Sequence, residues 1–262
     1  MILFPFLHDC VRRKRRATAR IRSRSRARPL CAALAALCLL LALSACRDES
    51  EDYSVLRERM VADQIAARGI GDVRILAAMR KVPRHLFVPE PVRSEAYEDH
   101  PLPIGEGQTI SQPYIVALMT LAIAPQAAMR VLEVGTGSGY QAAILAELSR
   151  SVYTIEIVET LGRRAAALLA ARYPNIHVRI GDGYRGWPEE APFDAIIVTC
   201  SPTEVPSPLV EQLREGGRMV IPVGERGIQE LVLLTKQASR LVRESILPVR
   251  FVPMVDSRGK RY

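Results

Sequence analysis

Short apolar runs alternate with segments of helical periodicity through the second half of the chain. Runs rich in Val, Ile and Leu predict strands, and apolar residues spaced three or four apart predict helices. The expected strands are 129–135, 151–157, 176–182, 193–199, 218–224 and 229–236, with one or two more within 240–254, and the expected helices are 140–149, 158–173 and 206–217. Repeated strand–helix units favour an α/β fold with a doubly wound, mostly parallel sheet and helices on both faces.

The pattern between residues 54 and 125 is different. Helical spacing predicts helices at 54–68, 73–79 and 113–124, and the prolines within 82–91 exclude a continued helix there. The polar stretch "GEGQTISQP", residues 105–113, predicts a loop before the third helix. We therefore divide the body into an N-terminal helical and substrate-loop region, 54–125, and an α/β core with C-terminal strands, 126–262.

Residues 1–46 form a basic leader with an apolar centre. Fourteen consecutive apolar residues, Leu30–Leu43, follow the basic segment. A helix of that length reaches about 21 Å, short of the ~30 Å hydrocarbon core of a bilayer, so the order of segments indicates a secretory signal. The signal ends in "LSAC", residues 43–46, which resembles the lipobox of bacterial lipoproteins and predicts a lipid-modified Cys46 in the cell envelope.

Two alternatives to a lipoprotein stay open. Cys46 could merely follow a signal peptide or a single anchor helix, or translation could begin near Met60 and leave a cytoplasmic protein. A start at Met60 would remove part of the predicted first helix. Residues 47–53 are expected to be a short charged linker.

Charge and cysteine are concentrated in the leader. It carries nine more basic than acidic residues, and because the whole chain has a net charge of +8, residues 47–262 sum to −1. The high isoelectric point therefore gives no support to nucleic-acid binding by the folded part. Cys200 is the one cysteine after residue 46, so an internal disulfide or a cysteine metal site is excluded there, and we expect no metal.

The turn after the first strand of the α/β core is "EVGTGSGY", residues 133–140. Ligands of doubly wound sheets bind beyond the carboxyl ends of the strands, beside such a turn. The G-x-G-x-G spacing is not the G-x-G-x-x-G that holds a pyrophosphate. Glu133, at the start of the turn, suits a ligand with an ammonium group or hydroxyls better than a diphosphate, although a plain strand-to-helix turn is the alternative.

Two further carboxylates support a nucleoside ligand. Glu156 ends the second strand, 21 positions after Gly135, where an acid accepts hydrogen bonds from ribose hydroxyls. Asp182 lies between two glycines after the third strand and could accept the exocyclic amine of adenine, or could be a simple turn residue. Together these acids favour S-adenosylmethionine over a nicotinamide dinucleotide. The expected cofactor-binding residues are Glu133, Gly135, Thr136, Gly137, Ser138, Gly139, Glu156, Asp182, Gly183 and Thr199.

The sequence resembles the protein-L-isoaspartate O-methyltransferases. The resemblance rests on "RERMVADQIAARGI", "VPRHLFVPE", "GQTISQP", "VLEVGTGSGY", "GDGYRGWPEEAPFD" and "VRFVPM", which span roughly residues 54–255. It implies a Rossmann-like class I S-adenosylmethionine-dependent methyltransferase with an N-terminal helical extension. Such an enzyme methylates the free carboxylate of L-isoaspartyl residues in damaged proteins, and the ester then cyclises to a succinimide. Whether it also accepts D-aspartyl residues stays open.

The resemblance also implies that Ser111, with Thr109 beside it, is the catalytic residue. The substrate carboxylate is ionised at neutral pH and is itself the nucleophile, so the serine would only position it. The alternative is that Ser111 simply caps the helix that begins near Pro113. The chain departs from the family in Ile157 after Glu156, in "TCSP" at 199–202, and in its leader.

Three functions therefore stay open. The first is an isoaspartyl methyltransferase that acts as a monomer on isoaspartyl proteins and peptides and reaches the membrane through its lipid anchor. The second is a methyltransferase of the same fold with a small-molecule substrate. The third is a membrane-tethered binding protein without turnover.

Overall fold

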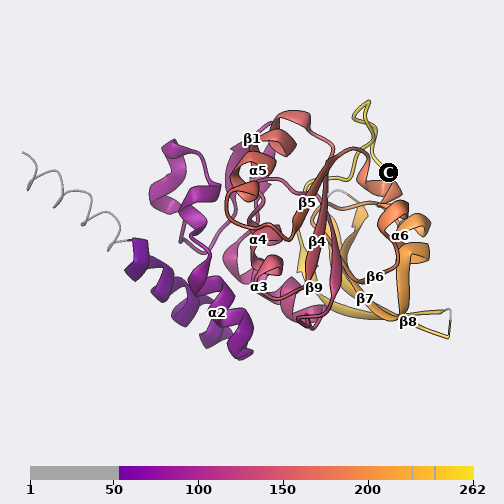
Figure 1. Cartoon of the computed structure of the whole chain (residues 1–262), viewed down its shortest axis with the longest axis horizontal. Helices are drawn as coiled ribbons and strands as arrows, with labels where there is room; N and C mark the ends of the chain where they lie inside the picture. The colour runs from indigo at the N-terminus through magenta and orange to yellow at the C-terminus, as the bar shows by residue number, and fades with distance from the viewer. Residues whose placement is uncertain (1–52, 226, 239) are drawn as a thin grey trace, which may run out of the picture. The chain divides into compact units, whose positions relative to one another are not determined.

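A seven-stranded sheet carries the α/β core, in the strand order β5-β4-β3-β6-β7-β8-β9 (Figure 1). The computed structural model describes residues 53–225, 227–238 and 240–262. The strands are β3 Arg130–Val134, β4 Ser151–Glu156, β5 Ile176–Ile180, β6 Phe193–Val198, β7 Leu213–Glu225, β8 Ile228–Gln237 and β9 Arg240–Val249. Strands β3 to β7 pair in parallel. Strand β8 pairs antiparallel with β7, and β9 pairs antiparallel with β8. The predicted mostly parallel sheet is confirmed.

Successive side chains of the central strands enter two different cores. Val131, Val152 and Ile197 pack on one face, and Leu132, Tyr153 and Ile196 pack on the other. This alternation follows from the two-residue period of a strand, and both faces are apolar because both are covered.

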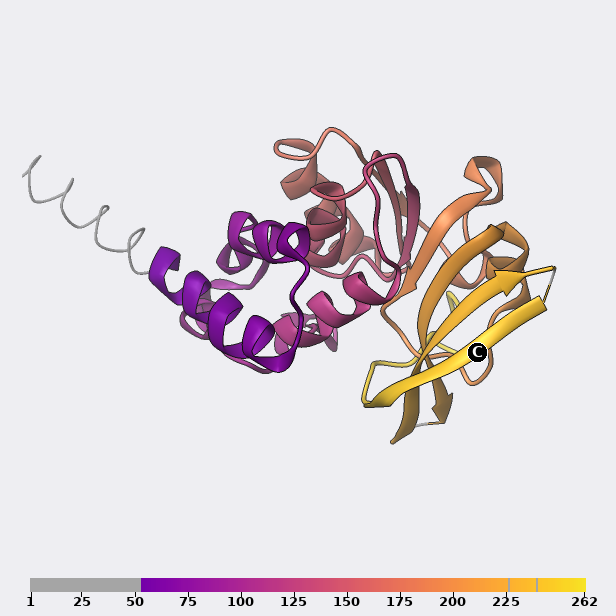
Figure 2. The same cartoon turned by 90° about the horizontal axis from the view of Figure 1, so that it is seen from below.

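Helices cover the two faces unequally. The cluster on the first face takes in α3 Pro113–Ala122, α4 Tyr140–Ala146 and α5 Glu159–Ala170. On the other face, α6 Ser207–Gln212 lies with the short helices η5 Gly183–Arg185 and η6 Pro188–Glu190 (Figures 1 and 2). The predicted doubly wound arrangement is therefore present.

The N-terminal region contains short helices and one hairpin. Residues 53–59 are α-helical and continue as the wider helix η1 Met60–Ile65 and the tighter turn η2 Ala66–Arg68. Next come α2 Val73–Lys81, η3 Arg84–Phe87 and η4 Glu90–Glu95. Asp72 caps α2 by accepting from the backbone N–H of Arg74 at 2.9 Å. The predicted helices at 54–68, 73–79 and 113–124 are confirmed.

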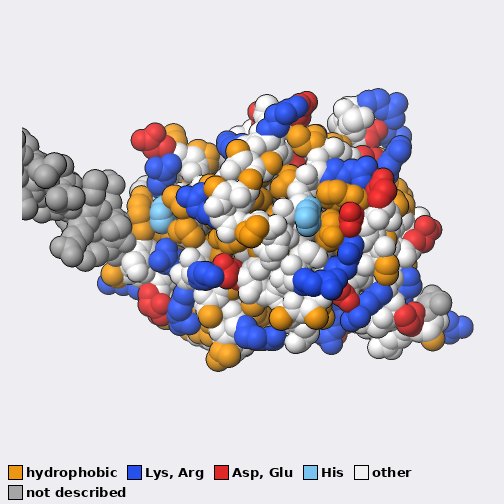
Figure 3. Space-filling view, viewed as in Figure 1, with side chains coloured by type: hydrophobic (Ala, Val, Ile, Leu, Met, Phe, Trp, Pro, Cys, Tyr) orange, Lys and Arg blue, Asp and Glu red, His pale blue; other side chains and the backbone are white. Residues whose placement is uncertain are grey.

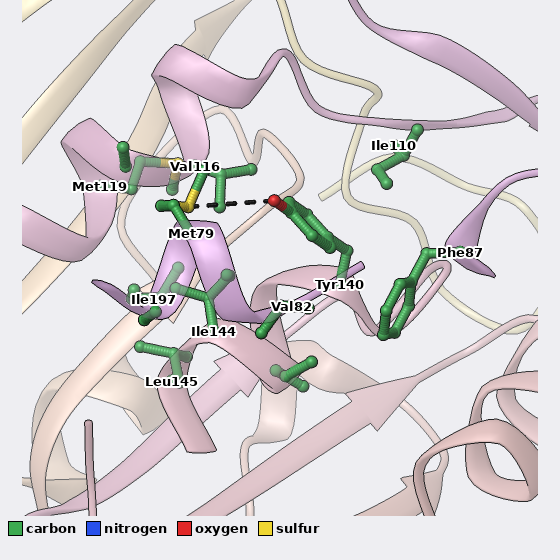
Figure 4. Close-up of a cluster of buried hydrophobic side chains, with 14 of the residues drawn as sticks. Met79, Val82, Phe87, Ile110, Val116, Met119, Tyr140, Ile144, Leu145 and Ile197 are labelled. Atoms are coloured by element: carbon green, nitrogen blue, oxygen red, sulfur yellow. Dashed lines mark hydrogen bonds between the residues drawn. The ribbon is translucent and has the colours of Figure 1, made fainter. Parts of the chain in front are cut away.

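This region packs onto the core through one apolar cluster (Figure 4). Met79 from α2, Val116 from α3 and Phe87 from η3 surround Tyr140, the first residue of α4. All four side chains are at most 4 % exposed. At roughly 2 kcal/mol for each large apolar side chain removed from water, such a cluster fixes the region against the sheet.

Two segments differ from the sequence prediction. The stretch predicted as a loop at 105–113 includes a strand, because β2 Gln108–Ile110 pairs with β1 Leu102–Gly105 in an antiparallel hairpin. The predicted helix 206–217 ends at Gln212, because Leu213 begins β7 by pairing with Phe193. The Lys236 ammonium donates to the backbone oxygens of Val210 and Leu213 at 2.9 and 2.7 Å and so satisfies the end of α6.

The predicted leader, 1–46, and the lipobox at its end lie outside the described residues. Within the part of the chain that the structure describes, no helix is long and apolar enough to cross a bilayer. On the face shown in Figure 3, Lys and Arg side chains are interspersed with Asp and Glu side chains.

Candidate active site

The candidate site lies where the sheet reverses its order of connection. The chain runs from β3 outward to β4 and β5, and then returns to β6 on the other side of β3. Ligands of such sheets bind beyond the carboxyl ends of the two strands at this point. Three cavities of about 630, 330 and 930 Å³ lie there, and Thr109 and Thr199 line all three.

Gly135 follows β3, and glycine suits this position because Thr199, the residue after the neighbouring strand β6, comes so close. Its φ is +98°, and a Cβ atom at this position would lie 2.3 Å from the Thr199 hydroxyl oxygen. That hydroxyl donates to the backbone oxygen of Gly135 at 2.6 Å. The turn therefore stays open toward the first two cavities, where Gly135 and Gly137 form part of the wall.

Glu156 ends β4 at the edge of the first cavity. Its carboxylate accepts from the backbone N–H of Gly137 at 2.7 Å and from that of Val158 at 2.9 Å. The side chain is 5 % exposed, so these two bonds fix its position. Because a carboxylate has about four acceptor positions, Glu156 can still accept from ligand hydroxyls.

Glu133 is fully buried below the same turn, in the wall of the second cavity. The Thr154 hydroxyl donates to its Oε2 at 2.5 Å and is itself 2.6 Å from the Thr136 hydroxyl. The other oxygen, Oε1, has no hydrogen-bond partner among the described residues. Burial raises the pKa of this carboxyl to about 8, so the site gains if a ligand supplies a positive charge.

The structure does not bring every predicted residue to a cavity wall. Gly183 and Ser138 line cavities, whereas Asp182 and Gly139 are absent from the linings of these three cavities. Asp182 accepts from the backbone N–H of Tyr184 at 3.0 Å and from the Tyr262 hydroxyl at 2.6 Å. Its contact with adenine stays a prediction.

The capping alternative for Ser111 is wrong. The residue that caps α3 is Gln112, and its side chain makes no capping bond. Ser111 lines the second and third cavities, and its hydroxyl has no hydrogen-bond partner within the described residues. Thr109, two residues earlier on β2, faces outward into all three cavities. The two hydroxyls therefore adjoin both the glycine turn and the third cavity.

Sequence reasoning did not assign residues 252–255 to the first cavity. This segment follows β9 and returns to the sheet, where Ser201 donates from its backbone N–H to Val252 at 2.8 Å and accepts from Met254 at 2.9 Å. Cys200 lies in the same wall, and burial raises the pKa of its thiol to about 12. Residues 252–255 lie over 50 residues after Cys200 along the chain, and no local sequence pattern predicts that they return to the same cavity wall.

Two of the histidines and Trp187 make ring contacts with tyrosine side chains. His85 stacks on Tyr53 at 4.2 Å between ring centroids, and His177 stacks on Tyr153 at 4.8 Å. Trp187 meets Tyr153 edge-on, as expected for a packing residue. In the described ranges, no group of three or more His, Cys, Asp or Glu side chains could hold a metal ion.

Comparison with known proteins decides the family. The sequence model of the protein-L-isoaspartate(D-aspartate) O-methyltransferase family matches residues 56–259. The chain belongs to this family.

Similar methyltransferases cover most of the chain. It is 59 % identical over 204 residues to the protein-L-isoaspartate O-methyltransferase of Opitutus terrae, covering 77 % of this chain and 88 % of that one. It is 53 % identical over 209 residues to protein-L-isoaspartate O-methyltransferase 1 of Syntrophobacter fumaroxidans, covering 79 % and 98 %.

Solved structures of the family share the fold. One protein-L-isoaspartate O-methyltransferase superposes with a TM-score of 0.71 at 31 % identity, over 78 % of this chain and 67 % of that one. A Plasmodium falciparum structure, described as a putative member in complex with S-adenosyl-L-homocysteine, gives 0.67 at 28 % identity, over 76 % and 97 %. The fold is that of Rossmann-like class I S-adenosylmethionine-dependent methyltransferases.

The residues present fit S-adenosylmethionine. The unpartnered Glu133 Oε1 suits the ammonium of its methionine part, and Glu156 suits ribose hydroxyls. The glycine turn, which a Cβ at Gly135 would fill, leaves room for the ligand between them. This family's methyltransferases use that cofactor, and the described site has groups suited to its methionine and ribose parts.

Proposed function

We propose that the protein transfers the methyl group of S-adenosylmethionine to the free carboxylate of L-isoaspartyl residues in damaged proteins and peptides. The observation that carries the proposal is the unengaged Ser111 hydroxyl, which adjoins the cofactor turn on one side and a wide cavity on the other. S-adenosylmethionine supplies a methyl group activated by a positively charged sulfur. The protein's own task is to bring a carboxylate oxygen in line with that group.

Ser111 and Thr109 hold the acceptor. A hydroxyl donor fixes one oxygen of the substrate carboxylate and leaves the other free to react. An aspartyl-type carboxylic acid is ionised at neutral pH, so no general base is required. Correct alignment alone can supply up to ~7–11 kcal/mol of the barrier.

The third cavity accommodates the polypeptide on either side of the damaged residue. One wall consists of residues 247–252, and the other contains Gln112, Tyr114 and Ile115. Residues 247–252 are consecutive, so this wall offers continuous backbone along which an extended peptide can lie, which favours a peptide over a small molecule. The methyl ester formed there carries methoxide, a better leaving group than the oxygen of a carboxylate. The backbone nitrogen of the following residue attacks the ester carbonyl, methanol leaves, and the succinimide closes without help from the protein.

A pair of matched peptides tests the substrate. We expect labelled methyl transfer to an L-isoaspartyl peptide and none to its L-aspartyl twin, with the D-aspartyl form as a third arm. Equal labelling of the first two peptides would disprove isoaspartyl specificity. Transfer to small carboxylic acids but to neither peptide would favour a small-molecule methyltransferase instead.

We also propose that the chain is lipid-anchored through Cys46. The support is the leader's order of basic segment, short apolar segment and "LSAC". Cells that express the full chain are grown with radiolabelled palmitate, and we expect a labelled protein in the membrane fraction. The Cys46→Ala variant should take up no label. An unlabelled wild type would disprove the lipid anchor and leave the two alternatives, a signal peptide or anchor helix without a lipid, and a cytoplasmic protein that begins near Met60.

A further inference from the structure

Arg84 is a fully buried cation that the proposed reaction does not use. It opens η3, and none of its side chain is exposed. Its Nε donates to the backbone oxygen of Ala96 at 2.8 Å, and its Nη2 donates to that of Ser111 at 2.7 Å. Its Nη1 is buried without a hydrogen-bond partner among the described residues.

No carboxylate neutralises this charge. Among the described side chains, Arg84 forms no ion pair, and its guanidinium contacts carbonyl oxygens and the face of the Tyr140 ring, 4.9 Å from its centroid. Burial lowers its pKa to about 10, so it stays protonated at neutral pH. A buried cation without a counter-ion is costly, which argues that the site gains from its charge.

The contacts of Arg84 join the two halves of the site. The carbonyl of Ser111 belongs to the segment that holds the acceptor, and Tyr140 directly follows the glycine turn of the cofactor site. Tyr140 is itself fixed among Met79, Val116 and Phe87, and its hydroxyl donates to Met79 Sδ at 3.9 Å (Figure 4). Ser111 is thus held through its backbone, while its hydroxyl remains without a partner.

We propose that Arg84 is a positioning residue for the methyl acceptor: it holds Ser111 by its carbonyl and makes the subsite beside Ser111 selective for an anion. Arg84 lines neither cavity beside Ser111, so its charge stabilises the substrate carboxylate through the intervening low-dielectric interior and not by direct contact. This inference rests on the proposed function, because it concerns the acceptor of that reaction.

The test compares two peptides that differ only in charge. One carries a free isoaspartyl α-carboxyl, and the other carries the corresponding α-carboxamide. Their Kd values are measured with S-adenosylhomocysteine present, so that no transfer occurs. We expect the wild type to bind the acid at least tenfold more tightly than the amide. In Arg84→Gln the acid should bind about tenfold more weakly, whereas the Kd of the amide should change less than twofold.

Arg130→Gln is the matched control. Arg130 also donates to a backbone oxygen, that of Glu190 at 2.5 Å, and lies over a tyrosine ring, Tyr153, at 5.0 Å. It stands at the amino end of β3, opposite the site. Loss of a packed arginine alone would affect both variants, so we expect Arg130→Gln to keep the acid-to-amide ratio of the wild type.

Arg84→Lys separates charge from geometry and serves if Arg84→Gln does not fold. Lysine keeps the positive charge, but it lacks the planar guanidinium whose Nε and Nη2 donate to the backbone oxygens of Ala96 and Ser111. We expect its acid-to-amide ratio to stay within threefold of the wild type and its kcat to fall at least tenfold, with the Kd for S-adenosylhomocysteine unchanged. An acid-to-amide ratio in Arg84→Lys that drops to one, or acid and amide binding that weaken equally in Arg84→Gln, would overturn the inference.

The outcomes also separate this inference from the proposed function. If the wild type methylates neither peptide form and binds acid and amide equally, the proposed function itself fails. If the wild type methylates the isoaspartyl peptide while the Arg84 variants keep its preference for the acid and its kcat, only the role of Arg84 is refuted.

Discussion

Replacing Glu133 by glutamine should make the protein more stable at alkaline pH and a weaker binder of its cofactor. Glu133 is fully buried, and its Oε1 has no partner among the described residues. Burial raises the pKa of its carboxyl from an ordinary value of 4.5 to about 8. Between these pH values the folded protein holds a proton at Glu133 that the unfolded chain has released.

The sign of the effect follows from this proton. Because the folded state binds more protons at Glu133, the contribution of this group to the stability of the wild type falls as pH rises from 4.5 to about 8, by roughly 1.4 kcal/mol per pH unit. The Glu133 contribution is therefore a cost of about 3 kcal/mol at pH 7 and about 5 kcal/mol above pH 8. Glutamine has no such dependence, because it does not titrate.

Glutamine has a cost of its own. Its amide oxygen can still accept from Thr154, but its NH₂ group would occupy the place of Oε1 without an acceptor, at roughly 1–3 kcal/mol. We therefore expect Glu133→Gln to be less stable than the wild type at pH 5 and more stable by a few kcal/mol at pH 8.5. The two stability curves should cross between these values.

Urea unfolding of both proteins at pH 5, 6, 7 and 8.5 measures the difference, with no cofactor present. Calorimetric titration with S-adenosylhomocysteine gives the second half of the prediction. The wild type should bind more tightly as pH rises toward 8, and the variant at least tenfold more weakly, because an ionised carboxylate bonds more strongly to an ammonium. A stability difference that is the same at every pH would refute the raised pKa.

Three further substitutions test the site. Ser111→Ala should lower kcat/KM for an isoaspartyl peptide by about 10- to 100-fold, which corresponds to the loss of one hydrogen bond to a charged group. The Kd for S-adenosylhomocysteine should stay within twofold of the wild type. Unchanged turnover would show that Ser111 has no part in the reaction. Gly135→Ala should abolish measurable cofactor binding in a titration, because the added Cβ would lie 2.3 Å from the Thr199 hydroxyl oxygen and the φ of this residue is positive. Wild-type affinity in this variant would contradict the close approach of Thr199. Tyr262→Phe removes a hydroxyl that donates to Asp182 at 2.6 Å. The loss should loosen residues 252–255 over the first cavity and weaken cofactor binding a few-fold. An unchanged Kd would show that this hydrogen bond does not affect cofactor binding.

The sequence alone predicted the parts of the site that are local. Strand and helix periods predicted β3 to β6 and the glycine turn between β3 and α4, because each depends on neighbouring residues. The position of Glu156 also followed, since an acid some 20 residues beyond the turn falls at the end of the adjacent parallel strand. The resemblance of "GQTISQP" to one family identified Ser111.

Only the tertiary structure decided what these residues contact. A serine just before a proline-started helix is typical of a cap, yet Gln112 stands at the cap position and Arg84, 27 residues earlier, holds the Ser111 carbonyl. Asp182 has the spacing of an adenine ligand, yet Tyr262, 80 residues later, takes one of its oxygens. The predicted helix 206–217 was cut at Gln212 because Leu213 pairs with Phe193. Such partners are distant along the chain and are chosen by packing of the whole sheet, so no local pattern of residues encodes them.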